Sequence, residues 1–170
     1  MPKLPSYGRF DVPGALTELL SEWAGPGQPM RLYAHFERIC RESVGHRLFT
    51  LLAWSPETDD VQRIHSSRPA EYPTSARKAM GPTEWGAHVL KGGQSWFGRH
   101  ADDIRWAFPD RDLILSLGCE SCLNTPVIFN GQVLGAVSVL GPAGAYTEAD
   151  LAGLERITPA LVPAFLLARA

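Results

Sequence analysis

The length, composition and charge of the chain exclude several classes of protein before any motif is considered. Its 170 residues are 45% hydrophobic and 20% charged, which is the balance of one globular domain and not of a disordered or fibrous chain. The net charge of -2 gives no general attraction to nucleic acid or to an anionic membrane surface, so we expect neither as a partner.

Nothing in the sequence indicates a secretory signal or a membrane-spanning helix. The first residues, Met1 to Pro5, contain no apolar run, and no later segment has the roughly 18 to 20 consecutive apolar residues that a spanning helix needs. Cys40, Cys119 and Cys122 form an odd set in a chain that is large enough to fold without disulfides. We therefore expect a cytoplasmic protein.

The first third of the sequence predicts two helices followed by two strands. Asp11 and Pro13 mark the start of one helix, and a second apolar stripe at helical spacing runs over residues 32–44. Residues 48–54 carry bulky or apolar groups on both faces, so this strand must be covered on both sides and lie centrally in its sheet. The more polar residues 61–67 are typical of an edge strand.

The middle of the chain alternates irregular segments with short helices. Residues 68–82 are rich in Pro, Ser and basic side chains and are predicted to form a long loop. Thr83 can cap a short helix, and residues 95–98 fit only an edge strand. Residues 100–109 are predicted to be a second loop, after which Asp110 can cap a further short helix.

A β-hairpin near the C-terminus is the clearest local signal. Residues 119–129 and 132–140 have strand character and are joined by Asn130 and Gly131, the pair that a type I′ turn requires. The two strands are therefore predicted to be antiparallel neighbours.

The last part of the sequence predicts one more helix and completes the order of elements. Thr147 can cap this helix, and Pro159 and Pro163 are expected to kink it or to split it. Strands that alternate with clusters of helices predict an α/β domain, and the hairpins set a central, mainly antiparallel sheet.

This order of elements, together with two short motifs, resembles the GAF domain family. The first motif is Asn-Thr-Pro-Val at residues 124–127, leading into Asn-Gly-Gln-Val-Leu-Gly-Ala at 130–136, where Gly135 takes the place of a glycine in the family's last central strand. The second is residues 146–151, which are similar to the start of the family's closing helix. The resemblance covers nearly the whole chain from about Arg31.

The resemblance implies a GAF-like (profilin-like) fold of the α/β, or α+β, class. Terminal helices would cover one face of the sheet, while loops and short helices would enclose a pocket on the other. The chain would be one domain over residues 1–170, with a helical extension at 1–30 and a core at about 31–170. GAF domains are chiefly sensory or regulatory, so the resemblance implies a small-molecule sensor without catalytic activity. It also implies a homodimer through the terminal helices, whose candidate contact residues are Leu16, Leu20, Leu154, Leu161 and Phe165.

The implied pocket would gather aromatic and polar side chains from the two loops and the hairpin. The aromatic rings could stack on a flat ligand, and the amide of Asn124, inside an apolar strand, is costly to bury unless it is hydrogen-bonded. Alternatively the rings fill the pocket themselves, which would leave a dimerisation or partner-docking domain. The candidate ligand-binding residues are Ser66, Tyr72, Trp85, Trp96, Arg105, Trp106, Asp110, Ser121 and Asn124.

The enzymatic alternative is a thiol-based reductase of the methionine-sulfoxide type that uses Cys119 or Cys122. One group of GAF proteins has this activity, but its cysteines lie further upstream and its surrounding motif is absent here. Strand alternation would place the two cysteines on opposite faces, and buried, inert thiols are the more common case. The chain has no nucleophile elbow and no H-E-x-x-H helix, and two thiols alone cannot complete a zinc site. We therefore expect no catalytic residues, metal or cofactor.

Overall fold

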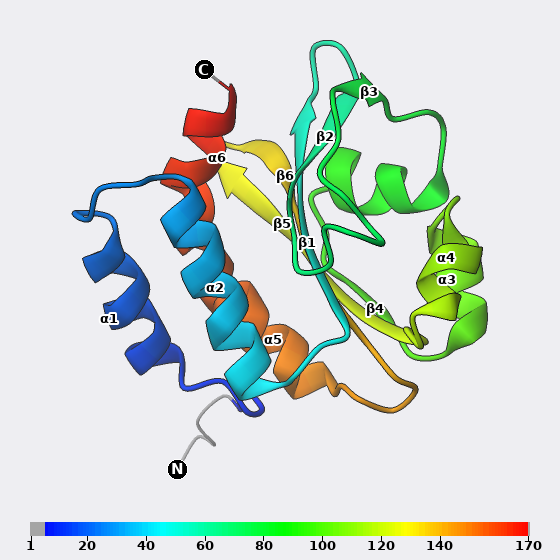
Figure 1. Cartoon of the computed structure of the whole chain (residues 1–170), viewed down its shortest axis with the longest axis horizontal. Helices are drawn as coiled ribbons and strands as arrows, with labels where there is room; N and C mark the ends of the chain where they lie inside the picture. The colour runs from blue at the N-terminus through cyan, green and yellow to red at the C-terminus, as the bar shows by residue number, and fades with distance from the viewer. Residues whose placement is uncertain (1–5, 170) are drawn as a thin grey trace.

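A six-stranded sheet in the order β3-β2-β1-β6-β5-β4 forms the middle layer of the structure, a computed structural model that describes residues 6–169 (Figure 1). Every pair of neighbouring strands is antiparallel. The strands are β1 (Leu48–Ser55), β2 (Asp60–Ser66), β3 (Lys78–Ala79), β4 (Trp96–Gly98), β5 (Ser121–Phe129) and β6 (Gln132–Gly141).

Helices lie on both sides of this sheet, and the two sides differ. In Figure 1, α1, α2, α5 and α6 lie on one side of the sheet. On the other side lie α3, α4 and the loop that follows β2. This arrangement confirms the predicted fold class. The helices are α1 (Val12–Glu22), α2 (Met30–Ser43), the π-helical turn η1 (Gly86–Lys91), α3 (Ala101–Ala107), α4 (Arg111–Ser116), α5 (Glu148–Ile157), the 3-10 turn η2 (Thr158–Leu161) and α6 (Val162–Arg169).

Strand β1 lies centrally, as its apolar sequence predicts, and pairs with β2 and β6. Phe49 and Leu51 are fully buried in the core beneath the terminal helices, whereas Leu48 and Leu52 pack in clusters on the other face. Both faces of the strand are therefore covered. Strand β2 is near the edge but not outermost, because the two-residue β3 pairs with Asp60 and Val61.

The β5–β6 hairpin is confirmed together with its turn. Asn130 and Gly131 have φ angles of 53° and 72°, which are the positive values of a type I′ turn. Further along β6, a Cβ atom on Gly135 would lie 2.0 Å from the carbonyl oxygen of Leu52. Only glycine therefore lets β6 approach β1 at this point.

The closing helix is split into α5, η2 and α6, as Pro159 and Pro163 predict. By length and composition alone, the run Glu148–Arg169 is apolar enough to cross a membrane, which the sequence reading did not expect. In the structure this run packs on the sheet with part of its surface, while Leu166 and Leu167 of α6 remain exposed. Leu154, Leu161 and Phe165 are fully buried in the core, so the expectation that these three residues face a second copy is wrong.

Residues 100–109 are not a loop, which corrects the prediction for this segment. They contain α3, because the Asp103 carboxylate accepts hydrogen bonds from the backbone N–H groups of Arg99 (2.7 Å) and His100 (3.3 Å) and so closes the first turn. Ile104 and Ala107 are buried on the side that faces the sheet.

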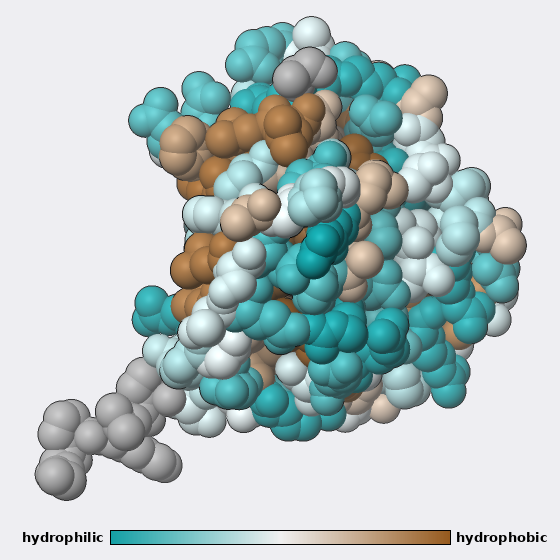
Figure 2. All heavy atoms as spheres, turned by 60° about the vertical axis from the view of Figure 1, so that its left-hand side comes forward, coloured by the Kyte–Doolittle hydropathy of each residue, from teal (hydrophilic) through white to brown (hydrophobic). Residues whose placement is uncertain are grey.

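Several large apolar side chains remain exposed on the side of the terminal helices. Figure 2 shows this side, with brown hydrophobic surface in several places among polar residues. The large apolar residues that are exposed on α1, α2, α6 and the α1–α2 connection are Leu20, Trp23, Met30, Leu166 and Leu167.

Candidate functional site

A cavity of about 330 Å³ lies on the face of the sheet opposite the terminal helices. Its floor is formed by three adjacent strands, which contribute Thr50 and Leu52 from β1, Val61 and Arg63 from β2, and Ser138 from β6. The cavity is therefore built on the central part of the sheet, where strand pairing fixes the position of each side chain.

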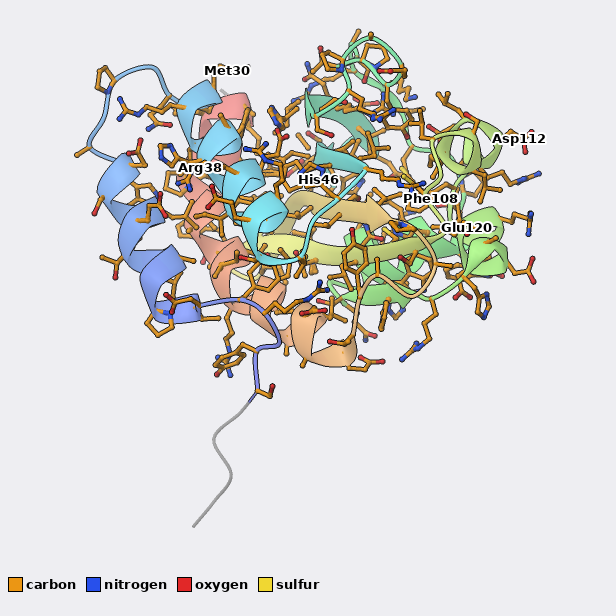
Figure 3. All side chains as sticks on the ribbon, turned by 60° about the horizontal axis from the view of Figure 1, so that its bottom comes forward. Met30, Arg38, His46, Phe108, Asp112 and Glu120 are labelled. Carbon is orange, nitrogen blue, oxygen red and sulfur yellow. The ribbon has the colours of Figure 1, made fainter. Side chains whose placement is uncertain are left out.

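The walls of the cavity are mostly apolar. Met80, Trp85 and Phe108 project over the floor from the segments that cross this face. The rings of Trp85 and Phe108 are tilted against each other with centroids 5.7 Å apart. Phe108 follows α3 on the cavity side of the sheet, whereas His46, just after α2, marks the opposite side (Figure 3). A ligand in this space would contact carbon atoms over most of its surface.

One end of the cavity is polar and carries charge. The Arg63 guanidinium lies 3.6 Å from the ring centroid of Tyr72, and its Nη1 donates to the carbonyl oxygen of Pro73 at 2.7 Å. The Tyr72 hydroxyl donates to Asp110, whose Oδ2 lies 3.8 Å from Arg63 Nη2. Burial and the Asp110 carboxylate raise the pKa of Tyr72, so this hydroxyl stays protonated. Arg63 is therefore held by a ring, a carbonyl and a carboxylate.

A hydrogen-bond network beside the floor fixes two of the lining residues. The fully buried Asn124 accepts from Trp85 Nε1 at 3.2 Å and donates from Nδ2 to Ser138 Oγ at 2.5 Å and to the Val137 carbonyl at 3.3 Å. Its amide is thus satisfied without a ligand. Asn124 does not line the cavity, but it orients Trp85 and Ser138, which do.

Three of the predicted ligand-binding residues, Tyr72, Trp85 and Asp110, line the cavity. Asp110 also precedes α4, but its side chain makes no capping hydrogen bond there. Ser66 pairs with Thr50 across the strands, and its hydroxyl accepts from the Arg68 N–H at 3.1 Å. Ser66 is therefore next to the lining and already engaged.

The other predicted residues lie away from the cavity. Trp96 and Trp106 stack on each other with centroids 5.6 Å apart, and Trp106 also donates to Glu84. Arg105 forms an exposed ion pair with Asp102 at 2.7 Å. Ser121 donates to the Pro142 carbonyl at 2.6 Å and borders a separate depression near Tyr146, so it does not contribute to this cavity.

The sequence reading missed Thr50, Arg63 and Ser138, all of which line the floor. Thr50 and Ser138 are small polar residues in otherwise apolar strands, which is a signal that could have identified them. Arg63 reaches the floor because the pairing of β1 with β2 shifts between Leu51 and Leu52, an irregularity of the β-bulge type. That shift has no signature in the sequence.

Cys119 and Cys122 lie in one buried cluster, so the expectation that they face opposite sides is wrong. The reason is that β5 begins at Ser121, and strand alternation does not extend back to Cys119. Burial raises the pKa of Cys119 to about 11 and that of Cys122 well above its usual value. Both thiols therefore stay protonated at neutral pH, whereas a nucleophilic cysteine reacts as the thiolate. Among residues 6–169 no cluster of His, Cys, Asp and Glu could hold a metal ion.

An antiparallel sheet with the terminal helices on one face and a cavity on the other defines an α+β domain. Residues 36–161 match the GAF domain family, and the chain belongs to this family. The match covers all six strands of the sheet, the segments around the cavity, α5 and η2.

Solved GAF structures share the fold at low sequence identity. The GAF domain of a phosphoenolpyruvate-protein phosphotransferase from Coxiella burnetii has a TM-score of 0.72 at 17% identity, covering 94% of this chain and 95% of its own. The GAF domain of a two-component sensor histidine kinase from Bacillus halodurans has a TM-score of 0.65 at 16% identity, covering 81% and 92%.

A third neighbour is an enzyme. The free methionine-R-sulfoxide reductase from Neisseria meningitidis, solved with its substrate, has a TM-score of 0.69 at 16% identity, covering 93% of this chain and 90% of its own. No curated protein sequence matches the chain at a significant level. At these identities the likeness shows the fold alone.

Proposed function

We propose that the chain is a sensory or regulatory domain that binds a small molecule in the cavity above β1, β2 and β6 without converting it. The observation that carries the proposal is the cavity itself, a mostly apolar space of about 330 Å³ whose lining also contains charged and hydroxyl side chains. Pockets of this size and lining are typical of small-molecule sites. GAF domains are commonly sensory, and the solved neighbours include a GAF domain of a sensor kinase.

The positions of the aromatic rings favour a ligand over a self-filled pocket. Trp96 and Trp106 stack on each other and do not line the cavity. Of the rings predicted to line the pocket, Tyr72 and Trp85 border the space, and together with Phe108 they leave it open. The high pKa values of the buried thiols are the reason that we do not propose a reductase. The same free, buried cysteines suit the reducing cytoplasm, where we place the protein.

We propose that the terminal helices pair two copies of the chain, so that a change in the domain can be passed to a partner. Leu20, Met30 and Leu167 are 47%, 60% and 52% exposed on this side. Apolar side chains of this size, gathered on one side of a small domain, are typical of an interaction surface. The cavity lies on the opposite face, so pairing would leave it accessible.

A ligand screen with an occlusion variant tests the binding proposal. Ala79 is exposed and lines the cavity. The indole ring that Ala79→Trp introduces should therefore fill the cavity without disturbing the core. Ala76→Trp, at an exposed position outside the lining, is the matched control. We expect a metabolite in a broad panel to raise the Tm of the wild type and of Ala76→Trp but not of Ala79→Trp. No response across the panel would refute the proposal.

A further inference from the structure

We propose that the ligand of the cavity is a small organic acid, in which a carboxylate is joined to a single ring or a short branched chain. This inference rests on the proposed function and adds the chemical class of the ligand. It is carried by three polar residues of the floor, Thr50, Ser138 and Arg63. Strand pairing relates them: Thr50 pairs with Ser138, and Arg63 pairs with Leu52, two residues along β1 from Thr50.

The hydroxyl of Thr50 is available to a ligand. Thr50 is 7% exposed and lines the cavity, yet its side chain forms no hydrogen bond with any residue that the structure describes. The oxygen reaches the open space of the cavity, because His46 Nε2 is the only fully buried side-chain nitrogen or oxygen without a partner among residues 6–169. A ligand that covers this hydroxyl must therefore offer it a partner. A ligand oxygen in the cavity would supply the missing acceptor.

Ser138 adds a second donor beside the first. It is the cross-strand partner of Thr50, so the two side chains stand next to each other on the same face. Ser138 Oγ already accepts from Asn124 Nδ2 at 2.5 Å. Because that contact uses a lone pair, the hydroxyl proton of Ser138 remains free to donate upward. Two neighbouring O–H donors suit a group that only accepts hydrogen bonds, as an ionised carboxylate does.

Arg63 supplies the positive charge and a fixed geometry. Its side chain is only 13% exposed, stacks on Tyr72 and is anchored to Pro73. A guanidinium has five N–H donors, and the single hydrogen bond and the 3.8 Å contact with Asp110 leave several of them open. A planar cation that is already held in place loses little entropy when it binds a carboxylate, and it can do so through two parallel hydrogen bonds.

The charge balance favours a monoanion over a cation or a dianion. Arg63 and Lys78 line the cavity against the single carboxylate of Asp110, which already accepts from Tyr72. Lys78 forms no ion pair within the described part of the chain, so its charge is available to a ligand. The nearby Lys91 lies outside the lining and is paired with Asp59. One surplus positive charge can balance a carboxylate, but the nearby Asp110 would repel a doubly charged phosphate ester.

The remaining walls define the other half of the ligand. Leu52, Val61, Met80 and Phe108 offer no hydrogen-bonding side chain, and the Trp85 N–H is used by Asn124. A polar group placed against them would lose water without replacement. The volume is at the small end of ligand sites, which fits one ring or a short branched chain.

Titration calorimetry with matched probes tests the inference on the full chain. The acids are benzoate, 3-phenylpropanoate and 4-methylpentanoate, and the probes without a carboxylate are benzamide, benzylamine and phenyl phosphate. We expect at least one acid to bind about tenfold more tightly than every probe without a carboxylate, because hydrogen bonds to a charged group are worth about that factor.

Two variants locate the binding groups. Thr50→Val removes the hydroxyl, keeps the shape and leaves no protein group unpaired, so we expect about tenfold weaker acid binding with stability unchanged or raised. Arg63→Gln should weaken acid binding further. The control is Thr125→Val on the opposite face of the sheet, which loses the 2.7 Å contact with Thr158 and should bind acids like the wild type.

The outcomes separate this inference from the proposed function. If benzamide or benzylamine binds as tightly as the acids and Ala79→Trp abolishes that binding, the cavity binds ligands but the carboxylate inference is wrong. The same holds if phenyl phosphate binds best, or if Thr50→Val and Arg63→Gln bind acids like the wild type. If neither these probes nor the broad metabolite panel binds, both proposals fail.

Discussion

Among the glycines of the strands, Gly135 leaves the least room for a side chain. A Cβ atom there would meet the Leu52 carbonyl oxygen at 2.0 Å and the Phe165 ring at 2.6 Å. Because the first of these is backbone of the neighbouring strand, the clash cannot be relieved by a rotamer change. Gly135→Ala should therefore lower the free energy of unfolding by roughly 3 kcal/mol or more in urea denaturation.

The control for Gly135 is a glycine with a positive φ and open space. Gly144 has φ of 72°, and a Cβ there would meet nothing within 4 Å. Gly144→Ala should carry only the conformational penalty of about 1 to 2 kcal/mol. Equal losses for the two variants would show that the close approach of β6 to β1 is not what requires Gly135.

His46 links the stability of the helical side to pH. Its side chain is 5% exposed, its Nε2 has no hydrogen-bond partner among residues 6–169, and Glu37 Oε1 lies 3.8 Å away. Glu37 is instead hydrogen-bonded to His65 Nε2 at 2.7 Å, and Arg41 lies beside it. Burial lowers the pKa of His46, an effect that the Glu37 charge opposes and that the charges of Arg41 and His65 reinforce.

The lowered pKa of His46 sets the sign of the pH effect. Below the pKa of the unfolded state, near 6.5, the unfolded chain binds a proton that the folded chain resists, so His46 reduces stability as the pH falls. In urea denaturation at pH 7 and pH 5, the wild type should lose more stability than His46→Phe. The exposed Gln94 has no titratable group and provides the control, so Gln94→Ala should behave like the wild type. Parallel losses in all three proteins would refute this role.

At the scale of elements, Asp150 joins the start of α5 to the segment that precedes α1. Its fully buried side chain accepts from the Thr147 N–H at 3.0 Å and pairs with Arg9 Nη2 at 2.8 Å. Burial alone would raise the pKa of Asp150, but the hydrogen bonds from Arg9 and Thr147 lower it, so the carboxylate stays charged. One residue thus completes a capping box and holds the N-terminal segment in place.

Asp150→Ala should lower the free energy of unfolding by about 2 kcal/mol, because it removes the cap and leaves Arg9 without its partner. Glu148 lies in the same first turn with its side chain 67% exposed, and Glu148→Ala should change stability by less than about 1 kcal/mol. Urea denaturation measures both variants. A loss for Glu148→Ala as large as that for Asp150→Ala would contradict this account.

Elements with strong local chemistry were predictable from the sequence, and those that depend on neighbours were not. The turn at Asn130 and Gly131 and the split at Pro159 are local effects and appear as expected. Helix α3 was missed because Asp103, inside the helix, closes its first turn, and no Ser, Thr, Asp or Asn precedes it.

The candidate site follows the same division. Tyr72 and Trp85 were identifiable as aromatic residues in segments that cross the sheet, and they line the cavity. Thr50, Ser138 and Arg63 come together only through the register of β1 with β6 and its shift against β2. Register is a property of the whole sheet, so no window of sequence around any one of these residues contains it.

Across the molecule, only the single layer of the sheet separates the cavity from the terminal helices, and β1 has side chains on both of its faces. On β1, Thr50 lines the cavity while its neighbours Phe49 and Leu51 are buried beneath the terminal helices. A ligand that moved β1 would therefore move groups that pack on α2 and the closing helices. A sensor needs such a connection, because a ligand shifts an equilibrium only if it interacts differently with the two states.

Pairing of two copies through the terminal helices can be tested by the oligomeric state of the protein. A stable protein interface buries roughly 1,200 to 2,000 Å² in total, and the exposed Leu20 and Leu167 belong to the side where we place it. In analytical ultracentrifugation the wild type should sediment as a dimer, and the double variant Leu20→Glu with Leu167→Glu as a monomer, because two carboxylates per copy would be buried without partners.

The matched control for this prediction is Leu113→Glu, since Leu113 is 39% exposed on α4, across the sheet from the terminal helices. It should leave the dimer intact. A wild type that stays monomeric at all concentrations would refute pairing, and dissociation by Leu113→Glu but not by the double variant would move the interface to the cavity side. In that case a second copy would cover the cavity, and ligand binding and dimerisation would compete for one face instead of using two.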